Sequence, residues 1–253
     1  MGVLGKRRGV NAHIKRVIKV CCALVCLAVL KSSSLLLASH SALGPPSLTR
    51  SGTLYGGWWY NAALIQPGAV VYSFGLGEDT SWDEALLMRG VDVYGFDPTP
   101  KSSVYVANRV ELKGKRGTFH YTAEGLSTRK YMAIFTKPAN PDHVSMREGN
   151  HTGLGSTIEV PVNTLYNFME KNGHKHLDIL KLDIEGTEYE VLEDLIVRNF
   201  LPFKQLLVEF HYRFDTHSTT IHEATINDLL GKGFVVTRNE RNQEISFEKR
   251  QSK

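Results

Sequence analysis

The sequence predicts an α/β domain with a largely parallel β-sheet over residues 60–253. From about Tyr60 onward, short apolar runs alternate with amphipathic stretches, which is the pattern of βαβ units. One run, LDILKL at Leu177–Leu182, has the composition of a buried strand. The 253 residues are 42% hydrophobic and 22% charged, so the chain can bury one sizeable core but is too short for two ordinary domains.

The first half of this domain is expected to contain three strands and one helix. Residues 69–74 form the first strand, and a glycine-containing turn joins it to a helix whose start, Ser81 to Glu84, has capping-box spacing. Gly90 follows that helix at a position where a left-handed residue is common. Residues 91–96 form the second strand, residues 118–121 form a weaker third strand, and residues 127–155 form an irregular insertion near the active-site face.

The second half alternates helices with strands and closes with a hairpin. The expected helices cover residues 163–171, 187–198 and 219–230, and the expected strands cover residues 177–182 and 206–210. Residues 234–238 and 244–249 are expected to pair as a hairpin.

The first 59 residues differ in composition from the domain that follows them. Residues 1–16 are a basic tail, residues 17–38 are apolar over a length that can span a bilayer about 30 Å thick, and residues 39–59 form a stalk. Residues 1–42 contain seven Lys and Arg and no Asp or Glu, so the positive-inside rule orients the tail toward the cytoplasm. We therefore expect a signal-anchor and a single-pass type II membrane protein whose domain faces the lumen of the secretory pathway. The alternative is a cleaved signal peptide and a secreted domain.

Charge and cysteine content argue against two other classes of protein. The formal net charge is +4, but residues 43–253 contain 23 Lys and Arg against 26 Asp and Glu, so the domain carries about −3. A domain of that sign has no general attraction to phosphate backbones, and we expect no nucleic-acid partner. The three cysteines, Cys21, Cys22 and Cys26, all lie in the apolar stretch, so the domain has no disulfide framework.

Two glycines follow the first expected strand, in the segment Gly75-Leu76-Gly77-Glu78-Asp79. Glycines at such a turn let the backbone approach a ligand, and the N-terminus of the following helix favours negative charge. A dinucleotide-binding turn has a third glycine where this chain has Asp79, which would repel a pyrophosphate but would tolerate the cationic part of an aminoacyl sulfonium ligand. The turn therefore favours S-adenosylmethionine over NAD.

Further acids are expected at the same edge of the sheet. Asp97 ends the second strand 20 residues after Gly77, where a carboxylate can accept hydrogen bonds from both hydroxyl groups of a ribose. Asp183 and Glu185 follow the strand Leu177–Leu182, and ligands of open α/β sheets gather at the carboxyl ends of the strands. The acids of the following helix are expected to be solvated and to have no role, namely Glu188, Glu190, Glu193 and Asp194.

A histidine follows the next expected strand, in the sequence LVEFH at residues 207–211. Strand alternation puts Glu209 and His211 on one face at its carboxyl end, where a histidine can act as general base toward a hydroxyl or amine acceptor. We expect Glu185, Glu209 and His211 to line the acceptor side of the site. A metal site at Asp183, Glu209 and His211 is kept as an alternative, and no metal ligand is assigned from the sequence.

The block LDILKLDIEGTEYEVL at residues 177–192, with LLVEFH at residues 206–211, closely resembles the FkbM family of methyltransferases. The family's hallmark is a strand, the motif K-x-D-x-E-G and a helix, and residues 60–250 follow the family's order of motifs. The resemblance implies a class I methyltransferase fold, which is a Rossmann-like seven-stranded sheet with helices on both faces and an antiparallel last strand. It also implies S-adenosylmethionine contacts at Gly75, Gly77, Asp97 and Asp183. The chain departs from the common pattern at Ser73, where many methyltransferases have an acid.

The resemblance therefore implies an S-adenosylmethionine-dependent methyltransferase, with O-methylation of a small-molecule, glycan or lipid acceptor as the expected chemistry. The chain also looks like animal methyltransferase-like proteins that carry this block behind an N-terminal hydrophobic segment. A catalytically silent fold that acts as a luminal binding module is one alternative, and an NAD-dependent oxidoreductase is another. The aromatic residues at the start of the domain are expected to pack in the core rather than to form a lid over an acceptor, namely Tyr55, Trp58, Trp59 and Tyr60.

Overall fold

The structure, a computed structural model, describes residues 48–140, 145–149, 155–212 and 218–250, which belong to one compact unit. The expected basic tail and the apolar stretch of residues 17–38 lie outside the described residues. Within the described ranges, no helix combines the length and the apolar character that a membrane crossing requires.

Strands and helices alternate along most of the described chain. The expected strands at Leu177–Leu182 and Glu244–Lys249 have the same bounds in the structure. In chain order the elements are β1 (Leu48–Ser51), β2 (Trp58–Asn61), η1 (Ala62–Leu64), β3 (Val70–Phe74), α2 (Ser81–Met88), β4 (Asp92–Phe96), α3 (Pro100–Asn108), η2 (Val110–Leu112), β5 (Phe119–Thr122), β6 (Gly125–Leu126), β7 (Tyr131–Thr136), β8 (Arg147–Glu148), β9 (Thr157–Asn163), α4 (Leu165–Asn172), β10 (Leu177–Leu182), α5 (Glu188–Val197), β11 (Phe203–Glu209), α6 (Thr219–Gly231), β12 (Phe234–Glu240) and β13 (Glu244–Lys249).

Seven of these strands form one sheet in the order β12-β13-β11-β10-β3-β4-β5. β10 pairs in parallel with both β3 and β11, and β4 pairs in parallel with both β3 and β5. β13 is antiparallel to its two neighbours, β11 and β12. The prediction of a seven-stranded α/β sheet with an antiparallel last strand is therefore confirmed.

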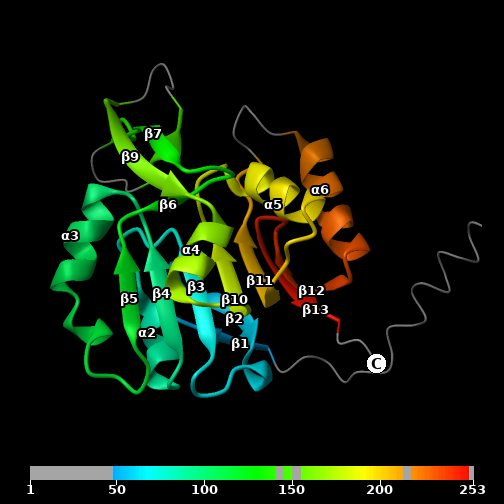
Figure 1. Cartoon of the computed structure of the whole chain (residues 1–253), viewed down its shortest axis with the longest axis horizontal. Helices are drawn as coiled ribbons and strands as arrows, with labels where there is room; N and C mark the ends of the chain where they lie inside the picture. The colour runs from blue at the N-terminus through cyan, green and yellow to red at the C-terminus, as the bar shows by residue number, and fades with distance from the viewer. Residues whose placement is uncertain (1–47, 141–144, 150–154, 213–217, 251–253) are drawn as a thin grey trace, which may run out of the picture. The chain divides into compact units, whose positions relative to one another are not determined.

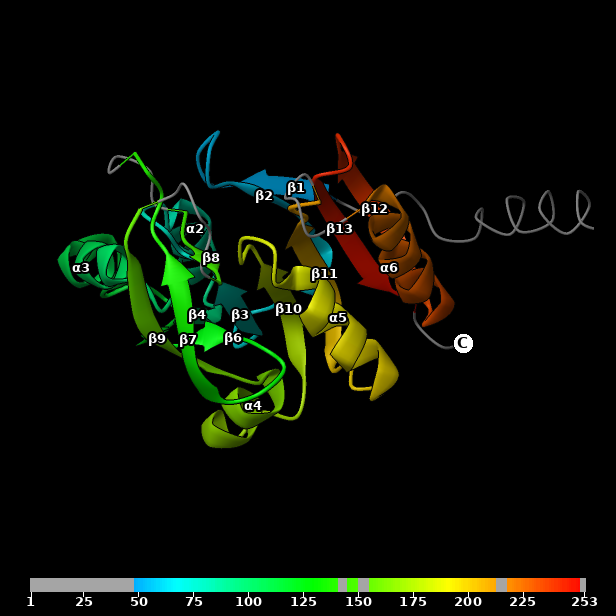
Figure 2. The same cartoon turned by 90° about the horizontal axis from the view of Figure 1, so that it is seen from above.

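Helices cover both faces of this sheet (Figure 1, Figure 2). On β3, Tyr72 and Phe74 belong to the core that α4, α5 and α6 complete, whereas Val71 belongs to the core on the opposite face, to which α2, α3 and β2 contribute. The alternation follows from the two-residue period of a strand, and all three side chains are fully buried. The inner strands are therefore apolar on both faces, as parallel strands between two helical layers must be.

A second sheet of four strands, in the order β6-β9-β7-β8, lies beyond the carboxyl ends of β3, β4 and β5 (Figure 1). It has a small core of its own, which includes Ala133, Phe135 and Val160. The prediction that residues 127–155 are irregular is wrong where β7 and β8 form. β7 lacks the polar and apolar alternation of a half-buried strand, because its outward residues Met132 and Ile134 are apolar and exposed.

Residues 48–59 fall within the expected stalk, and the structure places them in the compact unit with the sheet. β1 and β2 form an antiparallel arm, in which Trp58 and Tyr60 are buried in the core beside α2. The arm is joined to β11, because the backbone N–H of Asn61 donates a hydrogen bond to Gln205 Oε1 at 2.7 Å. Core packing of these two aromatic side chains agrees with the sequence prediction.

The start of α2 differs from the expected capping box. Ser81 is the first helical residue rather than the cap, and its backbone N–H donates to Asp79 Oδ1 at 2.8 Å. Asp79 therefore satisfies one of the N–H groups that a helix start leaves without an intrahelical partner. At the other end of α2, Gly90 has φ +82°, as expected for the residue that ends this helix.

Candidate active site

A cavity of about 500 Å³ opens at the carboxyl ends of β3, β4, β10 and β11. The strands end side by side here because they are parallel neighbours in the sheet. All seven site residues expected from the sequence line this cavity: Gly75, Gly77, Asp97, Asp183, Glu185, Glu209 and His211. Residues that are up to 136 positions apart in the chain, from Gly75 to His211, are thus brought to one place.

The glycine turn after β3 passes directly against the end of β10. Gly75 has φ +79°, and a Cβ atom at this position would lie 1.7 Å from the carbonyl oxygen of Asp183. Gly77 also has a left-handed backbone, with φ +53°. An L-residue with a side chain would be strained in both conformations. The turn can therefore approach β10 this closely only because residue 75 is glycine.

Asp97 closes the glycine turn from the end of β4. Its Oδ2 atom accepts hydrogen bonds from the backbone N–H groups of Leu76 at 3.0 Å and Gly77 at 2.9 Å. Its Oδ1 atom accepts from the backbone N–H of Thr99 at 2.8 Å and from its hydroxyl at 2.6 Å. These four donors fill the acceptor positions of a carboxylate. Asp97 therefore holds the turn in place, and a ribose hydroxyl would have to share or displace one of these donors.

Lys181, the first residue of the K-x-D-x-E-G motif, also stabilises the glycine turn after β3. Its ammonium group is buried, donates to the carbonyl oxygen of Gly75 at 2.5 Å and lies 3.8 Å from Asp183 Oδ2. The sequence analysis assigned no role to this lysine. Its position between two apolar residues of a buried strand was the available signal, because a lysine is rarely buried without a partner.

Asp83 of α2 is a second residue that the sequence analysis missed. It lines the cavity, its side chain is buried, and its Oδ1 atom has no hydrogen-bond partner among the described residues. Burial raises the pKa of Asp83 to about 6, although the positive charge of Lys181 partly offsets this rise. Asp83 thus brings an acid to the cavity from the helix, whereas β3 has Ser73 where many methyltransferases have an acid.

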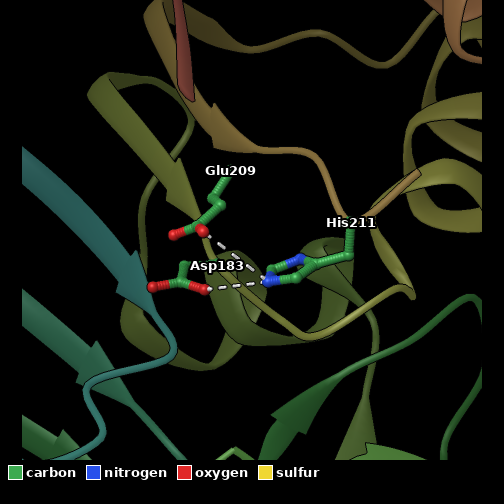
Figure 3. A group of neighbouring side chains, drawn as sticks. All are labelled: Asp183, Glu209 and His211. Atoms are coloured by element: carbon green, nitrogen blue, oxygen red, sulfur yellow. Dashed lines mark ion pairs between the residues drawn. The ribbon is translucent and has the colours of Figure 1, made fainter. Parts of the chain in front are cut away.

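Three carboxylates surround one ring nitrogen at the ends of β10 and β11. His211 Nε2 lies 3.4 Å from Glu185 Oε2, 3.9 Å from Asp183 Oδ1 and 3.9 Å from Glu209 Oε1. Figure 3 shows Asp183, Glu209 and His211 turned toward one another. Glu185 has φ +57°, a left-handed conformation that is strained for a residue with a side chain. Such strain is commonly found at functional sites.

Glu188 contacts the opposite side of the imidazole ring. The prediction that this acid is solvated and has no role is wrong. It is fully buried, and its Oε1 atom lies 2.8 Å from His211 Nδ1. The same carboxylate accepts hydrogen bonds from the backbone N–H groups of Ile184 at 2.9 Å and Gly186 at 3.0 Å. It is buried because it ties the motif's turn to the histidine. Of the other acids on α5, Glu190 and Glu193 are exposed, as expected.

The charges of His211, Glu209, Asp183 and Glu185 shift one another's pKa values. Burial alone would lower the pKa of His211, but the hydrogen bond to Glu188 and the negative charges of Glu188, Glu185 and Asp183 outweigh burial and raise the pKa to about 10. Burial, followed by the charge of Asp183, raises the pKa of Glu209 to about 7. Burial also raises the pKa of Asp183 and of Glu185. In the absence of another cation, His211 is therefore an imidazolium at neutral pH rather than the free base that the sequence analysis expected.

The segment between β1 and β2 lies at the rim of the cavity. Tyr55 lines the cavity with 80% of its surface exposed, so it differs from its buried neighbours Trp58 and Tyr60. Thr53 anchors the segment, because its hydroxyl donates to Asp79 Oδ2 at 2.6 Å. Of the four aromatic residues expected in the core, Tyr55 is thus exposed, and Trp59 is half-buried with the Arg238 guanidinium 4.6 Å from its ring centroid.

The chain is similar to curated proteins and to solved structures. It is 28% identical over 144 residues to the human protein named "Probable methyltransferase-like protein 24", a match that covers 56% of this chain and 32% of that protein. It is 26% identical over 159 residues to the rat protein of the same name, which covers 62% of this chain and 36% of that protein. The chain thus spans about a third of the length of these relatives.

Among solved structures, fibrillarin of Methanococcus jannaschii has a TM-score of 0.41 at 10% identity, and the match covers 82% of this chain and 85% of that chain. Fibrillarin of Aeropyrum pernix, which was solved with natively bound S-adenosyl-L-methionine, has a TM-score of 0.39 at 12% identity, with 73% and 66% covered. The family model of the methyltransferase FkbM domain matches residues 70–236, which run from the start of β3 into β12 and include the glycine turn, the K-x-D-x-E-G motif and the histidine. The chain therefore belongs to the methyltransferase FkbM domain family.

Proposed function

We propose that this chain transfers a methyl group from S-adenosylmethionine to a hydroxyl group of its acceptor. The observation that carries the proposal is the convergence of the glycine turn, Asp97 and the acids after β10 and β11 on one cavity. Membership of the FkbM family supports methyl transfer as the class of reaction. The choice of oxygen as the methyl acceptor is supported by the carboxylates of the cavity, since a hydroxyl must lose its proton when it is methylated.

The cavity fits S-adenosylmethionine in size and in charge. Its volume of about 500 Å³ lies within the range of roughly 300–1,000 Å³ that small-ligand sites occupy. When bound, S-adenosylmethionine supplies a methyl group that is activated by a positively charged sulfur. Gly75 and Gly77 line the cavity and have no side chains of their own to fill the space of the aminoacyl part, and Asp83 and Asp183 offer negative charge to the cationic part. Asp97 is the candidate partner of the ribose.

The acceptor side of the site consists of Glu185, Glu209 and His211. Both ring nitrogens of His211 already face carboxylates, with Glu188 on one side and the other acids on the opposite side. His211 therefore positions the carboxylates around it, and a carboxylate takes the proton of the acceptor hydroxyl. This assignment revises the general-base role that the sequence suggested for His211.

Calorimetric titration of the full-length chain with S-adenosylmethionine tests the proposal. We expect a dissociation constant in the micromolar range or below, and we expect that NAD neither binds at this concentration nor competes. Asp97→Ala should weaken binding at least about tenfold, which corresponds to about 1.4 kcal/mol. Asp92→Ala is the matched control, because Asp92 lies at the opposite end of β4 and accepts a hydrogen bond from the backbone N–H of Thr118.

Absence of S-adenosylmethionine binding would reject the enzymatic function. Binding without release of S-adenosylhomocysteine, in the presence of hydroxylated small molecules, glycans and lipids, would favour a silent binding module instead. Competition by NAD at equal concentration would favour the oxidoreductase.

We also propose that the domain faces the lumen of the secretory pathway behind a membrane anchor at residues 17–38. The proposal is supported by the apolar stretch, by the basic residues before it and by the sequon Asn150-His151-Thr152. Expression in a secretory cell should yield protein in the membrane fraction whose mass falls on endoglycosidase treatment. Asn150→Gln should remove that shift, and full accessibility of the domain to protease added to sealed microsomes would contradict this orientation.

A further inference from the structure

The group formed by Asp183, Glu209 and His211 has more negative charge than its neighbours neutralise. Together with Glu185 and Glu188, four carboxylates lie around one imidazole ring, and Lys181 reaches Asp183 alone among them. Desolvation of carboxylates is costly unless a cation or hydrogen-bond donors compensate them. Among the described residues, the cationic side chains within 4 Å of these four carboxylates are those of Lys181 and His211, so acids outnumber cations here and a further positive ion would be stabilised.

The donor atoms of Asp183, Glu209 and His211 are also arranged to bind a cation. One atom each from Asp183, Glu209 and His211 lie within 4.8 Å of one another, and both carboxylates have an oxygen 3.9 Å from His211 Nε2. Two ligands of an octahedral ion with bonds of about 2.1 Å lie roughly 3 Å apart when adjacent and roughly 4.2 Å apart when opposite. The two printed separations from His211 Nε2, 3.9 Å each, are roughly 1 Å longer than the adjacent-ligand distance, so the Asp183 and Glu209 side chains would rotate toward the ring when an ion binds.

Glu188 orients the ring for such a site. Its buried carboxylate engages His211 Nδ1, which leaves Nε2 on the side of Asp183 and Glu209. A carboxylate that accepts the second ring N–H of a histidine is the usual outer support of a metal-binding imidazole. Two backbone N–H groups hold Glu188 in turn, so its position is fixed before any ion arrives.

We propose that Asp183, Glu209 and His211 bind a divalent first-row transition metal ion, with Mn²⁺ as the ion to test first. The mixed set of one imidazole and two carboxylates favours such an ion over Mg²⁺ and Ca²⁺, which prefer all-oxygen sites. The three residues line the cavity, so the ion has open coordination positions on the acceptor side.

The role of this ion rests on the proposed function. An acceptor hydroxyl that binds the ion through its oxygen has a lowered pKa. Its proton then passes to the carboxylate of Glu185, which lies 3.4 Å from His211 Nε2 and is not among the three ligands. The ion would thus select acceptors that offer a hydroxyl, and in particular those with two adjacent oxygens that can chelate it.

Titration of the chelator-treated, full-length chain with MnCl₂, followed by the electron paramagnetic resonance signal of free Mn²⁺, tests the site. We expect one ion per chain and a nitrogen coupling to the bound ion in its spin-echo spectrum. Glu209→Gln and His211→Gln should each weaken binding by at least about 100-fold, and Glu188→Gln by about 10- to 100-fold. Glu78→Gln is the matched control, because Glu78 lines the same cavity but forms its ion pair with Lys101, and it should leave Mn²⁺ binding unchanged.

Failure to bind Mn²⁺ at millimolar concentration would overturn the inference, as would binding that persists in both Glu209→Gln and His211→Gln. If either variant fails to fold, as judged by circular dichroism, the stoichiometry and the nitrogen coupling of the wild-type protein decide. Calorimetry with S-adenosylmethionine on the metal-free protein separates the two proposals. Cofactor binding without Mn²⁺ binding removes the metal site alone, whereas Mn²⁺ binding without cofactor binding removes the proposed function and keeps the site.

Discussion

The two ends of the main sheet use the same residue type in opposite ways. β4 and β10 each have one aspartate near the amino end of the strand and another directly after its carboxyl end. At the amino end, Asp92 accepts a backbone hydrogen bond from Thr118, and Asp178 accepts one from Val70 and pairs with Lys204 at 2.7 Å. At the carboxyl end, Asp97 and Asp183 line the cavity instead.

The difference lies in the balance between donors and acids. Each aspartate at the amino end has its own hydrogen-bond donors within the fold. It therefore contributes to stability without a bound ligand or ion. At the carboxyl end Asp97 is also satisfied, but Asp183 shares His211 with three other carboxylates, and Lys181 pairs with Asp183 alone among the four. An excess of acids over donors is maintained where a parallel sheet binds its ligands, and the same excess at the amino end would only destabilise the fold.

Two glycines at the opposite ends of β3 give the strongest test of this comparison. Gly68 and Gly75 have similar backbones, with φ +83° and +79°. No atom lies within 4 Å of a Cβ built at Gly68, whereas a Cβ at Gly75 meets the backbone of Asp183 at 1.7 Å. We expect Gly75→Ala to lower the free energy of unfolding by about 4 kcal/mol or more, because the clash is with backbone. Gly68→Ala should cost only about 1 kcal/mol, the penalty of the left-handed conformation.

Urea unfolding followed by circular dichroism measures both changes. Equal losses for the two variants would mean that the close approach of the glycine turn to β10 is not a constraint.

The pH dependence of stability tests the carboxyl end through Asp83. Burial raises the pKa of this group from its ordinary value of 3.8 to about 6, so the folded state binds its proton more tightly than the unfolded state does. This contribution to stability is present below pH 3.8 and is lost as the pH rises through about 6. The total loss is up to about 3 kcal/mol, from a shift of about two pKa units.

Asp83→Asn keeps the shape of the side chain without the charge. The difference in unfolding free energy between Asp83→Asn and the wild type should therefore grow in favour of the variant from pH 4 to pH 7. The same set of urea titrations at each pH measures it. A difference that does not change with pH would show that burial does not raise the pKa of Asp83.

The smallest effect is expected at the amino end of β10. Asp178→Asn removes an ion pair with Lys204, whose side chain is 62% exposed, and keeps an oxygen for the backbone N–H of Val70. The cost should be about 1 kcal/mol or less in unfolding free energy, because exposed ion pairs are weak. Calorimetry should find S-adenosylmethionine binding unchanged. Weakened cofactor binding in this variant would break the distinction between the two ends.

Much of the fold could be predicted because several strands of the main sheet are apolar runs with polar residues at their ends. Leu177–Leu182 is a buried run closed by an acid, and polar residues separate β12 from β13. The bounds of β10 and β13 therefore agree with the prediction, whereas β12 extends two residues beyond the predicted strand. The second sheet could not be predicted, because β6 and β8 have two residues each and β9 contains Pro161. Proline within a run argues against a strand, and two residues are too few to show a period.

The site divides in the same way. Gly75, Gly77, Asp97 and Asp183 follow strand ends, and strand ends can be read from the sequence. Glu188 looked like an ordinary acid in the first turn of a helix, where the helix dipole favours negative charge in water. Its burial depends on His211, which is 23 residues away. Asp83 was missed for the same reason, since its position relative to the cavity depends on how α2 packs against β3.

The position of β13 between β11 and β12 has a consequence for how the protein is made. β13 follows every other strand of the main sheet in the chain, yet β12 joins the sheet only through it. Its first residue, Glu244, also forms part of the cavity wall. A nascent chain must therefore emerge from the ribosome past Lys249 before the sheet can be completed. Until then β11 has an open edge that can pair with another chain. Premature termination before Glu244 should give an aggregating product rather than a less active enzyme.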